Sequence, residues 1–327
     1  MSLRRTLVCL LLLDVLLQVG CAGSGRDHLL LEAGAPAIEL TGVPFFPQDD
    51  RQCGPAALAT VLCSASRSVT PGELTPQLYL PGRRGSLQTE MIAAARRYGR
   101  IPLVLAPTPA AIGAELAAGR PVLVLQNLGV SWLPVWHYAV VIGQLEDGNV
   151  VLRSGPERRL VMDAGRFLAT WRRAESWAMV VLRPGELPAR FDPQGYFTAL
   201  AAFETTGQPE IARQGYEAAL ARCPEQPVAL FGLANSLLAL GLHEQAVTTY
   251  RQLLALEPGH AAAVNNQAEA LSQLGCHQEA LDLLDRTLGD AGGGGQFRST
   301  LQQTRSEVGA RLISPGVDAC RFPPVRP

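Results

Sequence analysis

The sequence predicts an α+β domain followed by an all-α repeat domain, and two observations carry this prediction. Between residues 43 and 187, helical patterns come first and strand patterns come later, which is typical of helices packed on an antiparallel sheet. Beyond residue 192 the sequence repeats with a period of 34 residues, which indicates stacked helical hairpins. A chain of 327 residues has room for about two domains of ordinary size.

The first twenty residues have the pattern of an export signal. Two arginines precede the apolar run LVCLLLLDVLLQV, which is short for a membrane span and is interrupted by Asp14. The ending VGCAGSG resembles a bacterial lipoprotein signal, in which Cys21 would carry the lipid, although Gln18 stands where such signals usually have leucine. A plain secretory signal is the alternative. We expect residues 21–42 to be a tether and the protein to be anchored on the periplasmic side of a bacterial envelope membrane.

Residues 43–187 are expected to form helices and strands joined by short turns. The expected helices begin at Pro55 and cover 88–98, 109–118 and 164–171, and the expected strands cover 121–125, 137–142, 149–153 and 177–182. Asp147 and Gly148 form a hairpin turn signal, and Asp163 suits the N-cap of the helix that follows it. The segment 68–84 is expected to be a turn-rich loop.

The repeat region covers residues 193–290 and divides into units of 34 residues. The repeats cover residues 193–226, 227–260 and 261–294. One position of the repeat holds Gly207, Gly241 and Gly275, and another holds Ala212, Ala246 and Ala280. This length and these small residues match the tetratricopeptide pattern of helical hairpins. Residues 296–327 are expected to hold a capping helix, over 301–312, and a Pro-rich disordered tail. His243 and His277 are expected to be solvated loop residues.

Composition excludes several kinds of chemistry. The chain has no lysine, which removes the Walker phosphate-binding loop, Schiff-base chemistry and Ser-Lys mechanisms. The net charge of -1 indicates no nucleic-acid partner. The seven cysteines show no CxxC spacing, so neither a structural metal nor a cofactor is expected.

Cys53 is the candidate nucleophile. It is followed by Gly54, by Pro55 and then by an Ala- and Leu-rich run, so that it lies at a helix N-terminus. Unpaired amides and the positive end of the helix dipole stabilise a thiolate there, and the glycine lets a neighbour approach the sulfur closely. The alternative is a small buried hydrophobic residue.

His137 is the candidate general base. Of the five histidines, three lie in the repeat region and His28 lies in the tether, so His137 is the one that a nucleophilic Cys53 could use. Its context, VWHYAVVIG, places the imidazole at the start of an apolar strand, from which it could take the thiol proton and later donate it to the leaving amine. The alternative is a core histidine without a catalytic role.

Several other residues are candidates for the surroundings of the site. Gln48 could donate to a developing oxyanion alongside the backbone N–H of Cys53, and Gln52 is a weaker candidate. Cys63, about 280° around the helix from Cys53, is expected to face away from the site. Trp132 and Trp136 could line a substrate cleft or belong to the core.

The motif Q-x4-CGPAALA-x-VL, which begins at Gln48, and the later HYAVVIG, which begins at His137, carry a family resemblance. Together they are similar to the bacteriocin-processing cysteine peptidases, papain-like enzymes that cleave leader peptides after a double glycine. The closer resemblance is to stand-alone relatives in exported bacterial lipoproteins with C-terminal tetratricopeptide repeats. It covers residues 43–182 and 193–290, and it implies a papain-like domain that hydrolyses peptide bonds with a Cys–His pair and with Gln48 as the oxyanion donor.

Two departures from that family are visible. The glutamine usually stands six residues before the cysteine, whereas Gln48 stands five before Cys53. The relatives orient the histidine with an aspartate on the next strand, whereas this sequence reads LRSGPER and has Ser154 at that place. Serine can hydrogen-bond an imidazole but supplies no charge to stabilise an imidazolium.

These observations lead to one main hypothesis and two alternatives. The main hypothesis is an exported cysteine peptidase that acts on a peptide or protein substrate, with repeats that recruit that substrate or a partner protein. The first alternative is a catalytically weak or inactive peptide-binding scaffold. The second is a peptidoglycan amidase or transferase on a similar Cys–His core. Cleavage of the chain's own glycine run, residues 292–295, is a further hypothesis.

Overall fold

The computed structural model describes most of the chain outside its two ends. The described residues are 30, 36–47, 52–80, 82, 85–289, 294–312 and 320. The predicted signal, the lipidation site Cys21 and the predicted oxyanion donor Gln48 lie outside them, as do most of the predicted tether and tail. Half of the glycine run, residues 292 and 293, lies outside them as well.

The chain divides into two compact units. The first consists of Met1–Ser64, Ser68–Met91 and Val104–Val180, and the second of Ala65–Arg67, Ile92–Leu103 and Val181–Pro327. The first unit holds most of a β-sheet and the helices beside it, and the second holds the C-terminal helices. The predicted fold class, an α+β domain followed by an all-α repeat domain, is confirmed.

A seven-stranded sheet forms the centre of the α+β part. Its strands follow the order β2 (Ile101–Val104), β7 (Ala178–Leu182), β3 (Val122–Asn127), β4 (Trp136–Gln144), β5 (Val150–Ser154) and β6 (Glu157–Met162), and β1 (Ile38–Glu39) pairs with β4. The pairs from β7 through β6 are antiparallel. Strands β3 and β4 stay in one register from Val122 opposite Val141 to Asn127 opposite Trp136, so they form a long hairpin.

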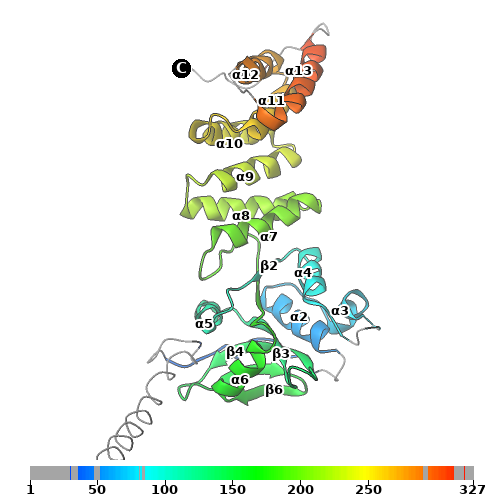
Figure 1. The fold of residues 1–327 in the computed structure, drawn as a ribbon, viewed down its shortest axis with the longest axis vertical. Helices are drawn as coiled ribbons and strands as arrows, with labels where there is room; N and C mark the ends of the chain where they lie inside the picture. Colours follow the sequence, from blue (N-terminus) through cyan, green and yellow to red (C-terminus); the bar gives the residue numbers. More distant parts are fainter. Residues whose placement is uncertain are drawn as a thin grey trace, which may run out of the picture. The chain divides into compact units, whose positions relative to one another are not determined.

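Five described helices accompany this sheet in the sequence: α2 (Cys53–Ser64), α3 (Pro71–Leu78), α4 (Gln88–Arg97), α5 (Pro109–Ala117) and α6 (Ala164–Arg172). Helix α2 packs against β4, whereas α5 and α6 pack against β3 (Figure 1). The residues of α2 from Gly54 to Leu62 are all buried, because this helix is apolar around most of its circumference. The helix that presents Cys53 is therefore held inside the unit.

Several elements escaped the sequence interpretation. Strand β1 lies within residues 21–42, which were expected to be a tether, but it pairs with β4, so that prediction was wrong there. Helix α3 occupies part of the predicted loop 68–84, so that prediction was wrong there. A capping box explains the helix, because Glu73 N–H donates to the Thr70 hydroxyl while the Glu73 carboxylate accepts from Thr70 N–H. Strand β6 was missed because its first residues are charged and exposed, as an edge strand tolerates.

The C-terminal helices come in successive pairs (Figure 1). The pairs are α7 (Pro193–Thr205) with α8 (Pro209–Arg222), α9 (Pro227–Ala239) with α10 (His243–Leu256), and α11 (Ala261–Gln273) with α12 (His277–Gly289). A short 3-10 helix, η2 (Gly295–Phe297), leads into α13 (Arg298–Leu312), which packs on α11 and α12. The repeated glycines lie in the turns within the pairs and have φ of 71°, 73° and 77°, which glycine adopts without strain.

The third repeat carries a disulfide, and beside it one prediction fails. Cys276, before α12, is bonded to Cys320 of the C-terminal tail. His277 was expected to be solvated, but it is buried, and its Nδ1 lies 3.1 Å from the Ser272 hydroxyl. Arg311 of α13 also donates to that hydroxyl, so packing of the last helix closes this position to solvent.

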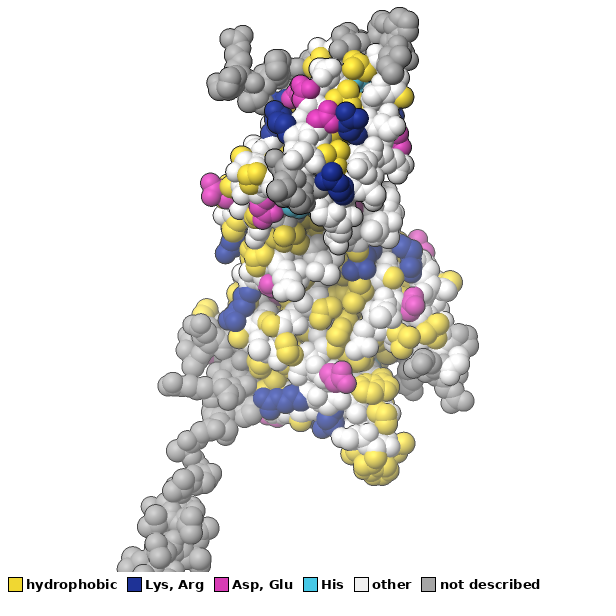
Figure 2. Space-filling model, turned by 45° about the horizontal axis from the view of Figure 1, so that its top comes forward, with side chains coloured by type: hydrophobic (Ala, Val, Ile, Leu, Met, Phe, Trp, Pro, Cys, Tyr) yellow, Lys and Arg dark blue, Asp and Glu magenta, His cyan; other side chains and the backbone are white. Residues whose placement is uncertain are grey.

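On the face in Figure 2, acidic and basic side chains are interspersed with hydrophobic ones. Within the described ranges, no helix is both long and apolar enough to cross a bilayer. Among the same residues, no group of three or more His, Cys, Asp or Glu side chains is placed to hold a metal ion.

Candidate active site

Cys53 is the first residue of α2, and its half-buried thiol meets several backbone amides. The N–H groups of Cys53, Gly54 and Tyr138 interact with the sulfur and lower the pKa of the thiol, while burial raises it. Burial is the larger effect, so the pKa of Cys53 lies above its ordinary value. The amides at the helix N-terminus therefore favour the thiolate, while burial favours the thiol more strongly.

His137 lies near the start of β4 and is half-buried. Its Nε2 lies 2.8 Å from the hydroxyl oxygen of Ser154, a buried residue that ends β5. The structure thus brings together the base predicted from the sequence and the residue at the expected orienting position. The partner is an uncharged hydroxyl, as the sequence indicated.

Strand β4 links the thiol to the histidine. The backbone N–H of Tyr138 interacts with the Cys53 sulfur, and His137 is the residue directly before it. Along a strand, side chains alternate between the two faces. Trp136 and Tyr138 point into the cavity that Cys53 lines, whereas the side chain of His137, between them, extends to Ser154. Strand β4 thus contributes both to the cavity at Cys53 and to the pair of His137 and Ser154.

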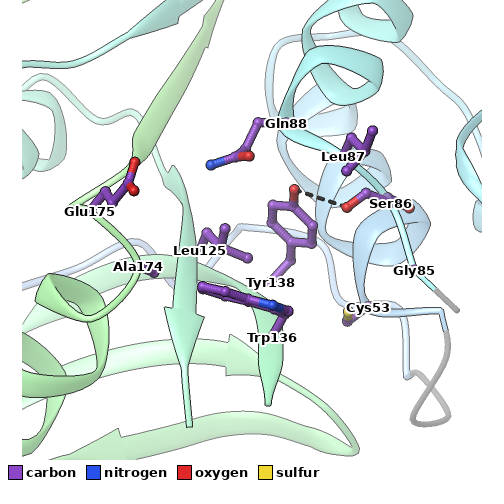
Figure 3. A pocket seen from close by; sticks show the side chains of 10 residues that line it. All are labelled: Cys53, Gly85, Ser86, Leu87, Gln88, Leu125, Trp136, Tyr138, Ala174 and Glu175. Carbon is purple, nitrogen blue, oxygen red and sulfur yellow. Dashed lines mark hydrogen bonds between the residues drawn. The ribbon is translucent and has the colours of Figure 1, made fainter. Parts of the chain in front are cut away.

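A cavity of about 640 Å³ opens at Cys53. Figure 3 shows the rings of Trp136 and Tyr138 near the Cys53 sulfur, with Glu175 on the opposite side of the cavity. Glu175 is the one charged side chain among the described lining residues. The others are Cys53, Gly85, Ser86, Leu87, Gln88, Leu125, Trp136, Tyr138 and Ala174. This volume is in the range that holds a small ligand or a few residues of a peptide.

The loop before α4 closes against the start of α2. A Cβ atom on Gly54 would lie 2.5 Å from the Ser86 hydroxyl oxygen and 2.8 Å from its Cβ, so only glycine lets the two segments meet. The Tyr138 hydroxyl donates to the Ser86 carbonyl, 3.3 Å away. Ser86 thus lies against Gly54 itself, whereas the sequence suggested that the glycine makes room for a group to approach the sulfur. No motif marks Ser86, Gln88 or Glu175, and Tyr138 lies in HYAVVIG without a role assigned to it, so sequence reasoning missed all four.

Arg153, next to Ser154 in β5, forms hydrogen bonds with the segment that precedes Gln48. It is buried, and its Nη2 donates to the carbonyls of Val43 and Thr41 over 2.9 and 3.2 Å. Its Nη1 donates to the carbonyl of Arg158. Strand β5 thus holds both the partner of the histidine and the chain that leads towards the site.

The remaining sequence candidates have clear positions. Cys63 donates to the carbonyl of Val69 over 3.4 Å, which is a packing role. Asp163 caps α6 by accepting from the backbone N–H of Arg166. Gln52 is exposed. Trp132 and Trp136 are not core residues, because they are 83% and 55% exposed.

A second cavity, of about 510 Å³, lies among the helices α7, α8 and α9 of the repeats. Phe197, Phe231 and Glu204 contribute to its lining. The Tyr216 hydroxyl donates to the Glu204 carboxylate over 2.7 Å, and burial raises the pKa of that carboxyl above its ordinary value. The repeats therefore offer a hollow with aromatic walls and a partly desolvated acid.

Comparisons with known proteins bear on each part separately. The family model described as tetratricopeptide repeat matches residues 198–251 and again residues 231–295, which confirms the predicted repeats. Among solved structures, the chain is similar to the peptidase domain of Streptococcus ComA, described as a bi-functional ABC transporter involved in a quorum sensing pathway. That similarity has 20% identity and a TM-score of 0.37, and it covers 43% of this chain and 98% of the other. No curated protein matches the chain.

Proposed function

We propose that this chain is a papain-like cysteine peptidase with Cys53 as nucleophile and His137 as general base. One observation carries the proposal. Cys53 opens α2 at the wall of a cavity of about 640 Å³, and the strand that passes its sulfur carries a histidine already held by Ser154. A nucleophile, a base and a group that orients the base are what nucleophilic catalysis requires.

The proposed reaction proceeds in two stages. His137, whose ring is oriented by the contact of Nε2 with Ser154, takes the proton of the Cys53 thiol as the sulfur attacks the peptide carbonyl carbon. The C–S bond forms, the C–N bond breaks, and the imidazolium returns its proton to the leaving amine. Water, deprotonated by His137, then hydrolyses the thioester and releases the thiol. No cofactor is needed.

A thiol with a raised pKa is expected to lose its proton to His137 while the sulfur attacks, rather than beforehand. The pKa of Cys53 is raised by burial, so the resting group is a thiol rather than an ion-paired thiolate. The negative charge that develops on the carbonyl oxygen needs donors. We assign this role to the backbone N–H of Cys53 and to the side chain of Gln48.

The repeats and the N-terminus give the proposed peptidase its setting. We propose that the repeat helices recruit the substrate or a partner protein, because such repeats present extended surfaces to other chains. We further propose that Cys21 is lipidated and holds the protein on the periplasmic side of a bacterial membrane.

The experiment that tests the proposal is peptide cleavage followed by mass spectrometry. Wild-type protein is incubated with a mixed peptide library, and the cleaved bonds are identified. We expect cleavage to disappear in Cys53→Ala and in His137→Ala. Cys223→Ala, which removes an exposed free thiol in the repeat part, is the matched control and should retain full activity. Cleavage that persists in Cys53→Ala would refute the proposal.

A second candidate function rests on the same geometry. Ser154, the residue at the orienting position, carries no charge and the Cys53 thiol has a raised pKa, which favours a scaffold that binds peptides without cleaving them. Binding of library peptides with no cleavage by wild type would select the scaffold. Hydrolysis of muropeptides but not of peptides would select the amidase or transferase instead.

A further inference from the structure

The hairpin that joins β3 to β4 ends in an exposed apolar tip, residues 128–136. Trp132 is 83% exposed, and five more large apolar side chains of the tip are exposed: Leu128, Val130, Leu133, Val135 and Trp136. The sequence from Asn127 to His137 contains no Asp, Glu or Arg. Apolar side chains gathered in this way on a described surface indicate an interaction site.

The backbone of the tip satisfies its own hydrogen bonds. Val130 and Leu133 exchange N–H···O bonds of 3.2 and 3.1 Å, and Leu128 N–H donates to the Val135 carbonyl over 2.9 Å. The side chain of Asn127 accepts from the N–H groups of Gly129 and Val135, over 3.0 Å each. A segment can enter hydrocarbon only if its backbone polar groups are paired internally. Most of this tip meets that condition without water.

The tip is apolar on both of its faces. Val130 lies opposite Leu133, and this register continues that of β3 and β4, so Leu128, Val130, Leu133 and Val135 share one face. Trp136 faces the other side, where it lines the cavity at Cys53. A Cβ on Gly129 would lie 2.3 Å from the Leu133 carbonyl, so the two arms meet closely. A rigid partner protein would cover only one face of such a hairpin. A fluid phase, such as the interior of a lipid bilayer, would surround both faces.

The residue types favour a lipid surface as that fluid. Tryptophan is enriched where membranes meet water, and leucine and valine partition into acyl chains. A cation stands at the base of the tip, where Arg173 donates through Nε and Nη2 to the carbonyl of Asn127. An anionic lipid headgroup complements such a charge. The tip is apolar and its base carries a cation, which matches a bilayer, where apolar acyl chains lie below a layer of charged headgroups.

The predicted anchor would keep the tip within reach of a membrane. Leu30 is buried in the core, and the segment from Cys21 to Leu30 spans at most about 30 Å when fully extended, so a lipid on Cys21 would hold the first unit near the bilayer. We propose that residues 128–136 insert into the surface of a lipid bilayer that contains anionic lipid. The insertion would bring the cavity that Trp136 lines to the membrane surface. This proposal does not depend on catalysis.

Quenching of tryptophan fluorescence by brominated lipid tests the proposal. Full-length protein is mixed with vesicles of equal parts phosphatidylcholine and phosphatidylglycerol, with or without bromine on the acyl chains. Bromine quenches an indole that reaches those chains, and the local readout is independent of attachment through the N-terminus. We expect bromolipid to quench the fluorescence of wild type. Trp132→Phe should lose most of this quenching, because it removes the indole at the tip.

Two further variants separate insertion from other effects. Trp132→Ser/Leu133→Ser should abolish quenching at an unchanged melting temperature, because both side chains are exposed. Val228→Ser/Leu242→Ser, which removes exposed apolar side chains from the repeats, is the matched control and should be quenched like wild type.

Three results would overturn the proposal. The first is no quenching of wild type by bromolipid. The second is a wild-type dimer that the Trp132→Ser/Leu133→Ser variant makes monomeric, which would assign the tip to a second copy of the chain. The third is binding of apolar peptides that this variant abolishes while bromolipid has no effect, which would assign the tip to a peptide.

Discussion

The imidazole Nε2 of His137 lies 2.8 Å from the hydroxyl oxygen of Ser154, a buried and uncharged residue at the end of β5. The hydroxyl can fix the orientation of the ring. It cannot stabilise an imidazolium by charge. The first prediction follows from this: Ser154 orients the His137 ring but supplies no charge to it.

We expect Ser154→Ala to lower kcat/KM about two- to tenfold, because a neutral hydrogen bond contributes about 0.5–1.5 kcal/mol. The measurement is cleavage of a peptide identified in the library experiment, across pH. Ser236→Ala removes another buried hydroxyl, in the repeats, and should leave kcat/KM unchanged. An unchanged kcat/KM in Ser154→Ala would show that the hydrogen bond has no role in catalysis.

The second prediction concerns the acidity of Cys53. Because burial raises the pKa of its thiol, we expect alkylation by iodoacetamide to rise with pH around a midpoint above the ordinary value of about 8.5. The rate is measured at Cys53 by mass spectrometry in a Cys63→Ala/Cys223→Ala background, which removes the other free thiols of the described chain. A midpoint near pH 6 would instead indicate an ion pair with the histidine.

The same shift has a consequence for stability. The folded state binds the thiol proton more tightly than the unfolded chain does, so this contribution to the free energy of unfolding is complete below the unfolded pKa. It is lost as pH rises through the folded pKa. Denaturant unfolding at neutral and alkaline pH should show a smaller alkaline loss in Cys53→Ala than in wild type.

The third prediction concerns the contact between α2 and the loop before α4. Gly54→Ala would place a Cβ 2.5 Å from the Ser86 hydroxyl oxygen, and we expect it to cost about 1–3 kcal/mol of unfolding free energy and to lower peptide cleavage. Gly309→Ala in α13 is the control, because a Cβ there meets nothing within 4 Å. It should be neutral or stabilising by up to about 1 kcal/mol. Equal stability of the two variants would contradict the close contact.

The fourth prediction concerns the disulfide between Cys276 and Cys320. It closes a segment with a sequence separation of 44, and we expect Cys320→Ser to lower the free energy of unfolding by about 2–4 kcal/mol. Thermal unfolding followed by circular dichroism is the measurement. A reductant should lower the Tm of wild type but not of Cys320→Ser, and Cys223→Ser should respond like wild type. A wild type that is indifferent to reductant would show that the bond does not form.

Part of the site could be predicted from local patterns. Cys53 is followed by Gly and Pro and then by an apolar run, and this order by itself places it at a helix N-terminus. His137 begins an apolar strand, and a turn signal before the next strand brings Ser154 near it. These are short-range relations, which the chain encodes within a few residues.

Other parts depend on contacts that no local pattern encodes. The approach of Ser86 to Gly54, 32 positions away, follows from the packing of a loop on α2. The raised pKa of Cys53 depends on how deeply the folded unit buries the sulfur, which outweighs the amides that the helix start provides. The pairing of Cys276 with Cys320 likewise needs the path of the chain, because spacing alone leaves several pairings open.

The sequence by itself determined the two-part architecture, the repeats and the residues that could carry catalysis, because periodicity, helix starts and turn signals are local properties. Only the tertiary structure decided the cavity beside Cys53, the burial of His277 and the exposure of Trp132. Each of these depends on which distant segments cover a residue. Burial is a property of the assembled fold, and at this site burial sets the acidity of the thiol.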